Sequence, residues 1–172
     1  MSSPPRVRLV PATVPLLLAL AEDRDAFGRL IGSTVPDGWP EFPEAVTFTL
    51  EHLRSAPPQD QAWSMQLFID DADGRLVGSG GFAAPPADRA VEIGYEIAPG
   101  FRGRGLGSAA ARALVERAVA SGEVDRVVAH TLPGPNGSTG VLRSLGFDHV
   151  ADREDPEVGT VWEWRWVRPS SY

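Results

Sequence analysis

Apolar and polar side chains alternate along residues 91–97, which is the pattern of a strand with one buried face. Valine, isoleucine and tyrosine occupy the odd positions, and two glutamates and a glycine occupy the even ones. Pro99 and the glycine after it end this strand. A glycine then recurs at every second position from 103 to 107, before an alanine-rich run that favours a helix. The pattern therefore predicts a strand, a glycine-rich loop and a helix in direct succession.

The rest of the chain shows the same two periodicities in turn, without an internal repeat or an interdomain linker. We expect a single domain over residues 1–172, with its core at about 6–168. Its class is α/β (α+β), with a mixed, mostly antiparallel central sheet flanked by helices on both faces. Strands are expected at residues 6–10, 62–70, 75–82, 91–97, 126–131, 147–154 and 160–168, and helices after Thr13 and at 24–31, 44–55, 105–121 and 138–145.

The composition narrows the classes of function. The 172 residues include 23 acidic and 16 basic side chains, for a formal net charge of −7. An acidic chain is poorly suited to a phosphate backbone, so we expect no nucleic-acid partner, whereas a cationic substrate such as an amine is compatible. The absence of cysteine excludes disulfides, thiolate metal sites and a cysteine nucleophile. The three histidines lie far apart in the sequence, and we expect no metal site.

An apolar run at residues 16–21 follows two arginines and resembles a secretory signal. However, two prolines interrupt the segment, and Glu22 follows it directly. An internal helix with Thr13 as its N-cap and Pro15 in its first turn fits better. No stretch approaches the ~20 apolar residues that a membrane span needs. We therefore expect a cytoplasmic protein with no membrane partner.

The loop at residues 102–108 has the properties of an anion site. Its glycines let backbone N–H groups approach a phosphate, the following helix start supplies free donors, and Arg102 and Arg104 add positive charge. The Gly-Lys-Ser/Thr ending of a nucleotide-binding P-loop is absent. Residues 78–83 fit a dinucleotide fingerprint formally, but the prolines that follow prevent a helix there, and we interpret these glycines as close strand packing or a bulge.

Two motifs resemble one enzyme family. The pattern Arg102-x-x-Gly105-x-Gly107 resembles the acyl-CoA pyrophosphate loop of the GCN5-related N-acetyltransferases, although a purely structural glycine-rich turn remains an alternative. Residues 136–147, with the sequence NGSTGVLRSLGF, resemble the Asn-x-Ser helix and the Gly-Phe ending of that family. Residues 92–95 and 130–133 are similar to the branch that includes ribosomal-protein N-terminal alanine acetyltransferases. The resemblance extends from about residue 6 to residue 168.

The resemblance implies a set of residues for binding the cosubstrate acetyl-CoA. The backbone of the central strand at its end would bond the pantetheine arm, and backbone N–H groups of the loop would hold the pyrophosphate. Asn136 would contact the pantetheine arm or fix the splayed strands. The implied residues are Ile97, Ala98, Arg102, Gly103, Arg104, Gly105, Leu106, Gly107, Ser108 and Asn136.

Acetyl transfer to an amine also needs a base, because an amino group is mostly protonated near neutral pH. Glu92 and Glu96 lie on one face of the central strand, and we prefer Glu92 because of where the family places its carboxylate. Exposed strand carboxylates without a catalytic role are the alternative. The family often protonates the departing thiolate with a tyrosine whose position here is Leu142. Ser138 is the substitute that the branch offers, unless it only caps a helix.

These observations predict an acetyl-CoA-dependent N-acetyltransferase that acts on a primary amine by direct attack in a ternary complex. No covalent intermediate is expected, because cysteine and an evident Ser-His-acid arrangement are lacking. A protein N-terminus is the first acceptor by resemblance, and a small-molecule amine is the second. The alternative is a catalytically inactive acyl-CoA-binding sensor or interaction domain. The loop at residues 33–43 and the closing hairpin formed by residues 147–154 and 160–168 are expected to select the acceptor. The tryptophan-rich last strand is a possible homodimer contact.

Overall fold

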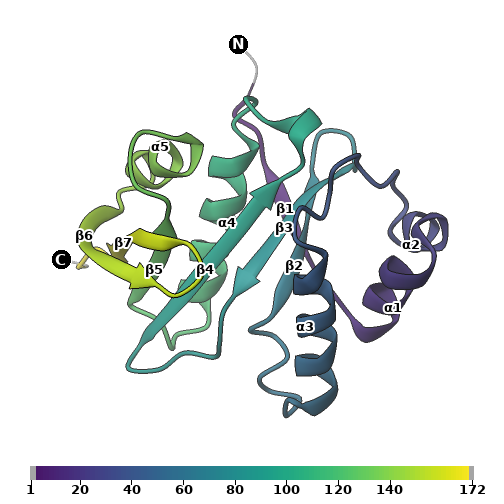
Figure 1. The fold of residues 1–172 in the computed structure, drawn as a ribbon, viewed down its shortest axis with the longest axis horizontal. Coiled ribbons are helices and arrows are strands. Elements are labelled where there is room, and N and C mark those ends of the chain that lie inside the picture. The colour runs from purple at the N-terminus through teal and green to yellow at the C-terminus, as the bar shows by residue number, and fades with distance from the viewer. Residues whose placement is uncertain (1–2, 171–172) are drawn as a thin grey trace.

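The computed structural model describes residues 3–170, which form one seven-stranded sheet with helices on both faces (Figure 1). The strand order is β1-β2-β3-β4-β5-β7-β6. The strands are β1 (Val7–Pro11), β2 (Met65–Asp70), β3 (Leu76–Phe82), β4 (Ala90–Ile97), β5 (Arg126–Thr131), β6 (Asp148–Asp155) and β7 (Gly159–Val167). The helices are α1 (Val14–Glu22), α2 (Arg24–Ile31), α3 (Pro43–Ser55), α4 (Leu106–Ala120) and α5 (Gly137–Ser144), with a 3-10 turn η1 (Pro99–Phe101) before α4.

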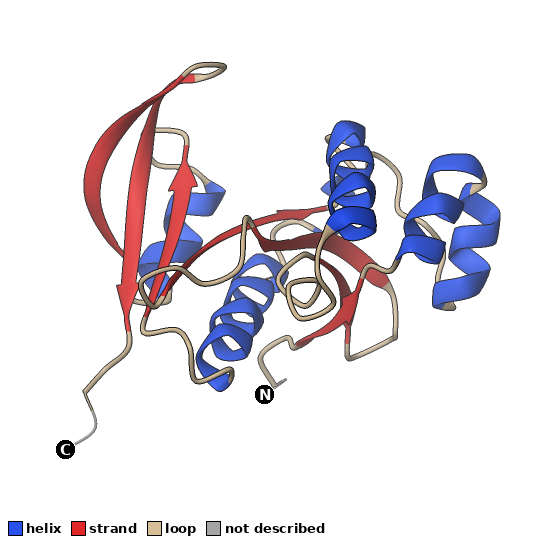
Figure 2. Cartoon of the chain, turned by 90° about the horizontal axis from the view of Figure 1, so that it is seen from below, coloured by secondary structure: helices blue, strands red, loops and turns tan. Residues whose placement is uncertain are grey.

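The sheet confirms the predicted fold class. Every neighbouring pair of strands is antiparallel except β4 and β5, which are parallel. Successive residues of a strand face opposite sides, so Leu67 packs with helices α1–α3, and Phe68 packs with α4 and α5. The two hydrophobic cores lie on opposite sides of the sheet, and the edge-on view separates the two groups of helices (Figure 2).

The predicted boundaries hold to within one residue except at β2, which begins at Met65 rather than at residue 62. The preceding residues form turns instead, with the Trp63 N–H donating to the Asp60 carbonyl at 3.0 Å. Trp63 is buried and meets the Phe82 ring edge-on, with the ring centroids 5.0 Å apart. Trp63 therefore contributes to the core although it lies in a turn. The alternating pattern of apolar residues could not distinguish this turn from a strand.

The glycines of β3 allow the close strand packing that the sequence predicted. A Cβ atom on Gly78 would lie 2.1 Å from the Glu96 carbonyl oxygen, and one on Gly80 would lie 2.3 Å from that of Gly94. A side chain at either position would push β3 away from β4. These two glycines therefore allow the end of β4 to lie close to β3.

The loop between α2 and α3 contributes one residue, Trp39, to the core. Trp39 is only 2% exposed, and its indole N–H donates to the Ser79 hydroxyl at 2.9 Å. Its ring stacks near Phe27 with a centroid separation of 6.0 Å. Trp39 therefore closes the core, whereas Phe42 in the same loop is exposed. In β7, Trp164 is likewise buried, and its indole N–H donates to Thr131 at 2.9 Å.

No helix within residues 3–170 is long and apolar enough to cross a membrane.

Candidate active site

The central feature of the site is a point where two neighbouring strands separate. The parallel pairing of β4 with β5 ends at Ile93 and Ala129, although β4 continues to Ile97 and β5 continues to Thr131. Beyond the last pair, one edge of β4 has no strand beside it. Such an edge leaves backbone donors and acceptors available to a ligand.

The ladder between β3 and β4 identifies which backbone groups face this opening. The Ala98 N–H donates to the Val77 carbonyl at 2.8 Å, and the Glu92 carbonyl accepts from the Ala83 N–H at 3.0 Å. Because antiparallel bonding alternates along a strand, the even-numbered residues of this segment bond to β3. The N–H and C=O groups of Tyr95 and Ile97 therefore point toward the opening.

This alternation corrects the expected role of Ala98. Its N–H bonds to Val77, its carbonyl accepts from the Phe101 N–H at 2.9 Å, and the residue is 2% exposed. Neither backbone group of Ala98 is available to a pantetheine arm. Of the two residues expected, Ile97 keeps an N–H toward the opening, and the backbone of Tyr95 also faces it.

A groove of about 470 Å³ lies beside this open edge, on the face of the sheet that carries α4 and α5. It brings together five of the ten residues that the resemblance implied for acetyl-CoA, from separate segments of the chain. Its walls are formed by Tyr95, Ile97, Phe101, Arg102, Gly103, Gly107, Leu132, Asn136, Gly137 and Ser138.

The start of α4 forms one end of this groove and has the predicted properties of an anion site. Gly105 is the N-cap residue with φ of +80°, and no side chain caps the helix. The first backbone hydrogen bond of α4 runs from the Ala109 N–H to the Gly105 carbonyl, at 3.1 Å. The N–H groups of Leu106, Gly107 and Ser108 precede it, so the helix geometry leaves them for an anion.

Both arginines of the loop bond to the protein itself, which differs from the expectation that they would supply free positive charge to a phosphate. The Arg102 side chain donates to the Ile97 carbonyl at 3.0 Å and lies 3.5 Å from a Glu41 carboxylate oxygen. Arg104 donates to the Gly100 carbonyl at 3.2 Å and lies 5.3 Å from the centroid of the Phe101 ring. These contacts fix the shape of the loop.

Asn136 fixes the connection between β5 and α5. Its amide oxygen accepts from the Thr139 N–H at 3.0 Å, and its amide nitrogen donates to the Leu132 carbonyl at 3.1 Å. Thr139 bonds back to the Asn136 N–H at 3.0 Å, which completes a capping box. The cap of α5 is therefore Asn136 and not Ser138. Ser138 is exposed in the first turn and lines the groove.

Tyr95 is a site residue that the sequence pattern concealed. The residue lines the groove and packs against the core beneath α4, while its hydroxyl is buried with no hydrogen-bond partner among the described residues. Burial raises the pKa of Tyr95 to about 12. The neighbouring Ser138 side chain counters part of this rise but lies outside hydrogen-bonding geometry. The alternating pattern of residues 91–97 had placed Tyr95 among the apolar positions. The signal that could have identified it as a site residue was a hydroxyl-bearing side chain near the end of that strand.

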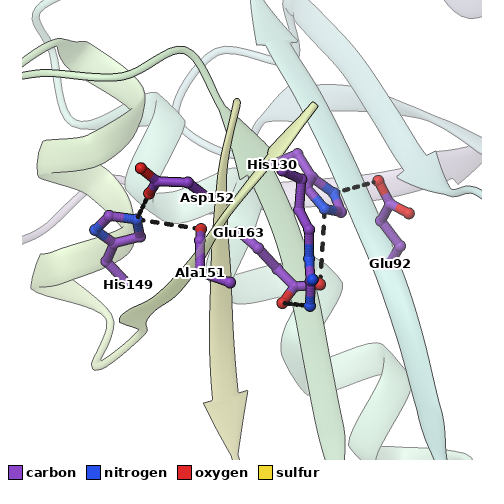
Figure 3. Close-up of polar contacts among 7 residues, drawn as sticks. Glu92, His130, His149, Ala151, Asp152 and Glu163 are labelled. Atoms are coloured by element: carbon purple, nitrogen blue, oxygen red, sulfur yellow. Dashed lines mark hydrogen bonds and ion pairs between the residues drawn. The ribbon is translucent and has the colours of Figure 1, made fainter. Parts of the chain in front are cut away.

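The two glutamates project from the opposite face of β4, as predicted, but they have different surroundings. Glu92 is exposed, and its carboxylate lies 2.9 Å from the Nδ1 atom of His130 (Figure 3). The Nε2 atom of His130 lies 3.8 Å from Glu163, which in turn bonds to Arg153 at 3.2 Å. Because a carboxylate only accepts, Nδ1 is the nitrogen that carries the proton in this contact. The sequence pattern did not indicate this row of contacts from Glu92 through His130 and Glu163 to Arg153, which spans four strands.

Glu96 instead belongs to the loop between α2 and α3. Its carboxylate accepts from the Glu41 N–H at 3.1 Å. Burial raises the pKa of Glu96 above its usual value, while this backbone hydrogen bond and the charge of Arg102 oppose the rise. Glu96 therefore anchors the loop at the mouth of the opening, and the two glutamates are not equivalent candidates.

A second hollow, of about 260 Å³, lies next to Glu92 on the face opposite the groove. A Cβ atom on Gly94 would meet nothing within 4 Å, so the space above this part of β4 is open. The groove and the hollow thus reach the same strand from opposite faces. The hollow is lined by Phe48, Thr49, His52, Ser64, Met65, Gly80, Gly81, Phe82, Ala83, Glu92, Ile93 and Gly94. Within residues 3–170, no group of three or more potential ligands has the geometry to hold a metal ion.

Solved structures of acetyltransferases share this arrangement of strands and helices. The enzyme from Salmonella typhimurium that modifies the N-terminal serine of ribosomal protein L7/L12 superposes with a TM-score of 0.66 at 19% identity, covering 95% of this chain and 96% of that one. RimJ of Mycobacterium smegmatis, solved with CoA-disulfide, gives 0.62 at 19% identity, covering 96% and 86%. The self-immunity acetyltransferase MccE, solved with acetyl-CoA and AMP, gives 0.64 at 16% identity, covering 94% and 92%.

The sequence itself supplies the family. Over 144 residues the chain is 33% identical to the mycothiol acetyltransferase of Acidothermus cellulolyticus, a match that covers 83% of this chain but only 38% of that protein. The chain thus spans well under half the length of this relative. Residues 6–148 match the acetyltransferase (GNAT) domain, and the chain therefore belongs to the GNAT family of acetyltransferases.

Proposed function

We propose that the protein acts as a single N-acetyltransferase domain that transfers the acetyl group of acetyl-CoA to a primary amine by direct attack in a ternary complex. One observation carries the proposal: the groove and the hollow approach the unpaired end of β4 from opposite faces. A thioester and an amine can therefore meet at this strand without a covalent enzyme intermediate. Such placement converts a reaction between two molecules into one within a single complex.

The groove fits the extended and charged parts of acetyl-CoA. The backbone groups of Tyr95 and the N–H of Ile97 face the opening and suit the amides of a pantetheine arm, because each needs a hydrogen-bond partner of the opposite kind. The Ile97 carbonyl already accepts from the Arg102 side chain. The N–H groups at the start of α4 suit the diphosphate, which the helix dipole also favours. The arginines of the loop support this arrangement by holding the loop closed on itself.

The pair formed by Glu92 and His130 is suited to accept the proton of the attacking amine. Both side chains are partly exposed on the face of the hollow, and they lie where the two strands begin to separate. Imidazole is the side chain whose ordinary pKa lies nearest to neutral pH, so it matches the task of a base. Glu92 keeps its proposed role in this reaction together with His130, whereas Glu96 positions the loop.

We further propose a protein N-terminus as the first acceptor and a small-molecule amine as the second. The carboxylates of Glu92 and Glu163 favour a cationic acceptor on this face. The hollow is shallow and largely apolar, with Phe48 exposed at its rim, which suits the first side chains of a peptide. The Salmonella typhimurium neighbour modifies a protein N-terminus.

The first test is a calorimetric titration with acetyl-CoA of the wild type and of two variants, Ser108→Asp and Ser108→Asn. A carboxylate in the first turn of α4 stabilises the helix but repels a diphosphate, whereas asparagine adds similar volume without charge. We expect Ser108→Asp to weaken binding at least tenfold, or about 1.4 kcal/mol, and Ser108→Asn to weaken it much less. Equal binding by all three proteins would place the diphosphate elsewhere.

The second test measures release of the free CoA thiol with named amine probes. A short peptide with a free N-terminal serine is compared with the same peptide in N-acetylated form and with small polyamines. Release that requires the free N-terminus supports the proposal. Tight binding of acetyl-CoA with no transfer to any of these amines would instead support a catalytically inactive acyl-CoA-binding domain.

A further inference from the structure

Tyr95 carries a buried hydroxyl with no hydrogen-bond partner among the described residues, although it lies at the wall of the groove. Buried polar atoms are nearly always paired, because an unpaired one has lost its water without compensation. Such an atom beside a binding groove indicates a partner supplied by the ligand. We propose that the Tyr95 hydroxyl donates a hydrogen bond to the sulfur of CoA as the sulfur leaves the acetyl group.

This inference deepens the proposed function and rests on it. The hydroxyl is well placed because the side chain and the backbone of Tyr95 act on the same ligand. Its backbone groups face the opening between β4 and β5, and the residue lines the groove on the face of α4. A pantetheine arm that follows the edge of β4 must therefore pass the tyrosine ring.

Only two of the side chains that line the groove carry a hydroxyl, those of Tyr95 and Ser138. Ser138 is exposed, so water can satisfy it before a ligand arrives. The Tyr95 hydroxyl is closed off from water and has more to gain from a new partner. Leu142 of α5 is buried in the same core cluster, and its side chain has no polar atom. Tyr95 is therefore the better donor to a sulfur inside the groove.

The chemistry follows from the acidities of the two groups. As the amine nitrogen bonds to the carbonyl carbon, the carbon–sulfur bond breaks, and its electron pair remains on sulfur. Burial raises the pKa of Tyr95 to about 12, whereas a free thiol has a pKa of about 8.5. The phenol thus keeps its proton and stabilises the thiolate as a hydrogen-bond donor. The proton lost by the amine goes to the pair of Glu92 and His130.

The proposal can be tested without knowing the acceptor, by titrating the thiol of CoA bound to the protein. The ultraviolet absorbance of the thiolate gives the thiol pKa for the wild type, for Tyr95→Phe and for Ser138→Ala. A donor to sulfur favours the thiolate, so we expect the wild type to lower the pKa of bound CoA by about one unit. Tyr95→Phe should return it to the value of free CoA, and Ser138→Ala should change it less. Equal values in the wild type and Tyr95→Phe would overturn the proposal.

Steady-state kinetics with the serine peptide give a second readout. Phenylalanine keeps the ring in the core, so the fold and the affinity for acetyl-CoA should change little. We expect kcat to fall by about 100-fold, which is the lower end of the range for removing one transition-state donor. A weaker affinity for acetyl-CoA at unchanged kcat would assign Tyr95 to binding instead. If the wild type transfers no acetyl group while its bound thiol pKa still depends on Tyr95, the proposed function fails and the hydrogen bond to sulfur stands.

Discussion

Glu92 and His130 meet across the point where β4 and β5 separate, with 2.9 Å between the carboxylate oxygen and Nδ1. His130 comes from the first position of β5 beyond its pairing with β4, so its ring is free to lean toward Glu92. On its other side, its Nε2 atom lies 3.8 Å from Glu163. The imidazole therefore lies between two carboxylates, one beside each ring nitrogen.

Glu92→Gln should lower kcat for acetyl transfer by about 100-fold at neutral pH, because the amide neither takes a proton nor stabilises a charged imidazole. His130→Gln should cause a loss of similar size, and the double variant should lose little more than either single one. The affinity for acetyl-CoA, measured by calorimetry, should be unchanged in all three. Full activity of Glu92→Gln at pH 7 would exclude this pair as the base.

Glu96→Gln should separate the second glutamate from the reaction. Because Glu96 anchors the loop and does not take the proton, kcat should fall by less than about tenfold. The kcat of Glu96→Gln should therefore remain well above that of Glu92→Gln. The glutamine oxygen still accepts from the Glu41 N–H, so the loop keeps its contact. A larger loss in Glu96→Gln than in Glu92→Gln would assign the base to Glu96.

The same variant makes a prediction about stability and pH. Burial raises the pKa of Glu96 in the folded protein, so folding favours its protonated form. The wild type therefore loses free energy of unfolding as the pH rises from the unfolded pKa, about 4.3, through the raised folded value. Glutamine removes this loss. Urea unfolding should show no advantage of Glu96→Gln near pH 3 and a stability advantage that has fully developed by pH 7.

Gly80→Ala and Gly94→Ala form a matched pair on neighbouring strands. The added Cβ would lie 2.3 Å from a backbone oxygen at Gly80 but meets nothing within 4 Å at Gly94. We expect Gly80→Ala to cost about 2 kcal/mol or more in free energy of unfolding, because β3 and β4 must move apart. Gly94→Ala should stay within about 0.5 kcal/mol of the wild type. A similar cost at both positions would show that the close approach of the strands is not the cause.

Asn136→Ala should destabilise the protein by about 1–2 kcal/mol, because it removes the cap of α5. It also frees the Leu132 carbonyl, so the wall of the groove should loosen. Affinity for acetyl-CoA should fall with it, as measured by calorimetry at a temperature where the variant is folded. Ser138→Ala, in the same turn but outside the cap, serves as the control and should leave the free energy of unfolding nearly unchanged.

Local sequence patterns were sufficient to predict the helices and strands, and also the part of the site formed by β4, the glycine-rich loop and the start of α4. The alternation at residues 91–97, the glycines at 103–107 and the alanine-rich run after them each act over a few residues. Strand, loop and helix start therefore form where they were predicted, and Gly105 caps α4 with the positive φ that only glycine adopts freely. Such features depend on backbone sterics and neighbouring side chains, which the sequence states directly.

The other half of the site depends on contacts between distant segments. The register of β3 against β4 decided that the Ala98 N–H bonds to β3, whereas the backbone groups of Tyr95 face the opening. The end of the pairing between β4 and β5 brought His130, which lies 38 residues along the chain, to Glu92. Burial, and not residue type, left the Tyr95 hydroxyl without a partner and gave Glu96 its raised pKa. The sequence by itself determined the elements and the glycine-rich loop before α4, whereas the tertiary structure decided which polar groups meet, because register and burial are properties of the packed chain.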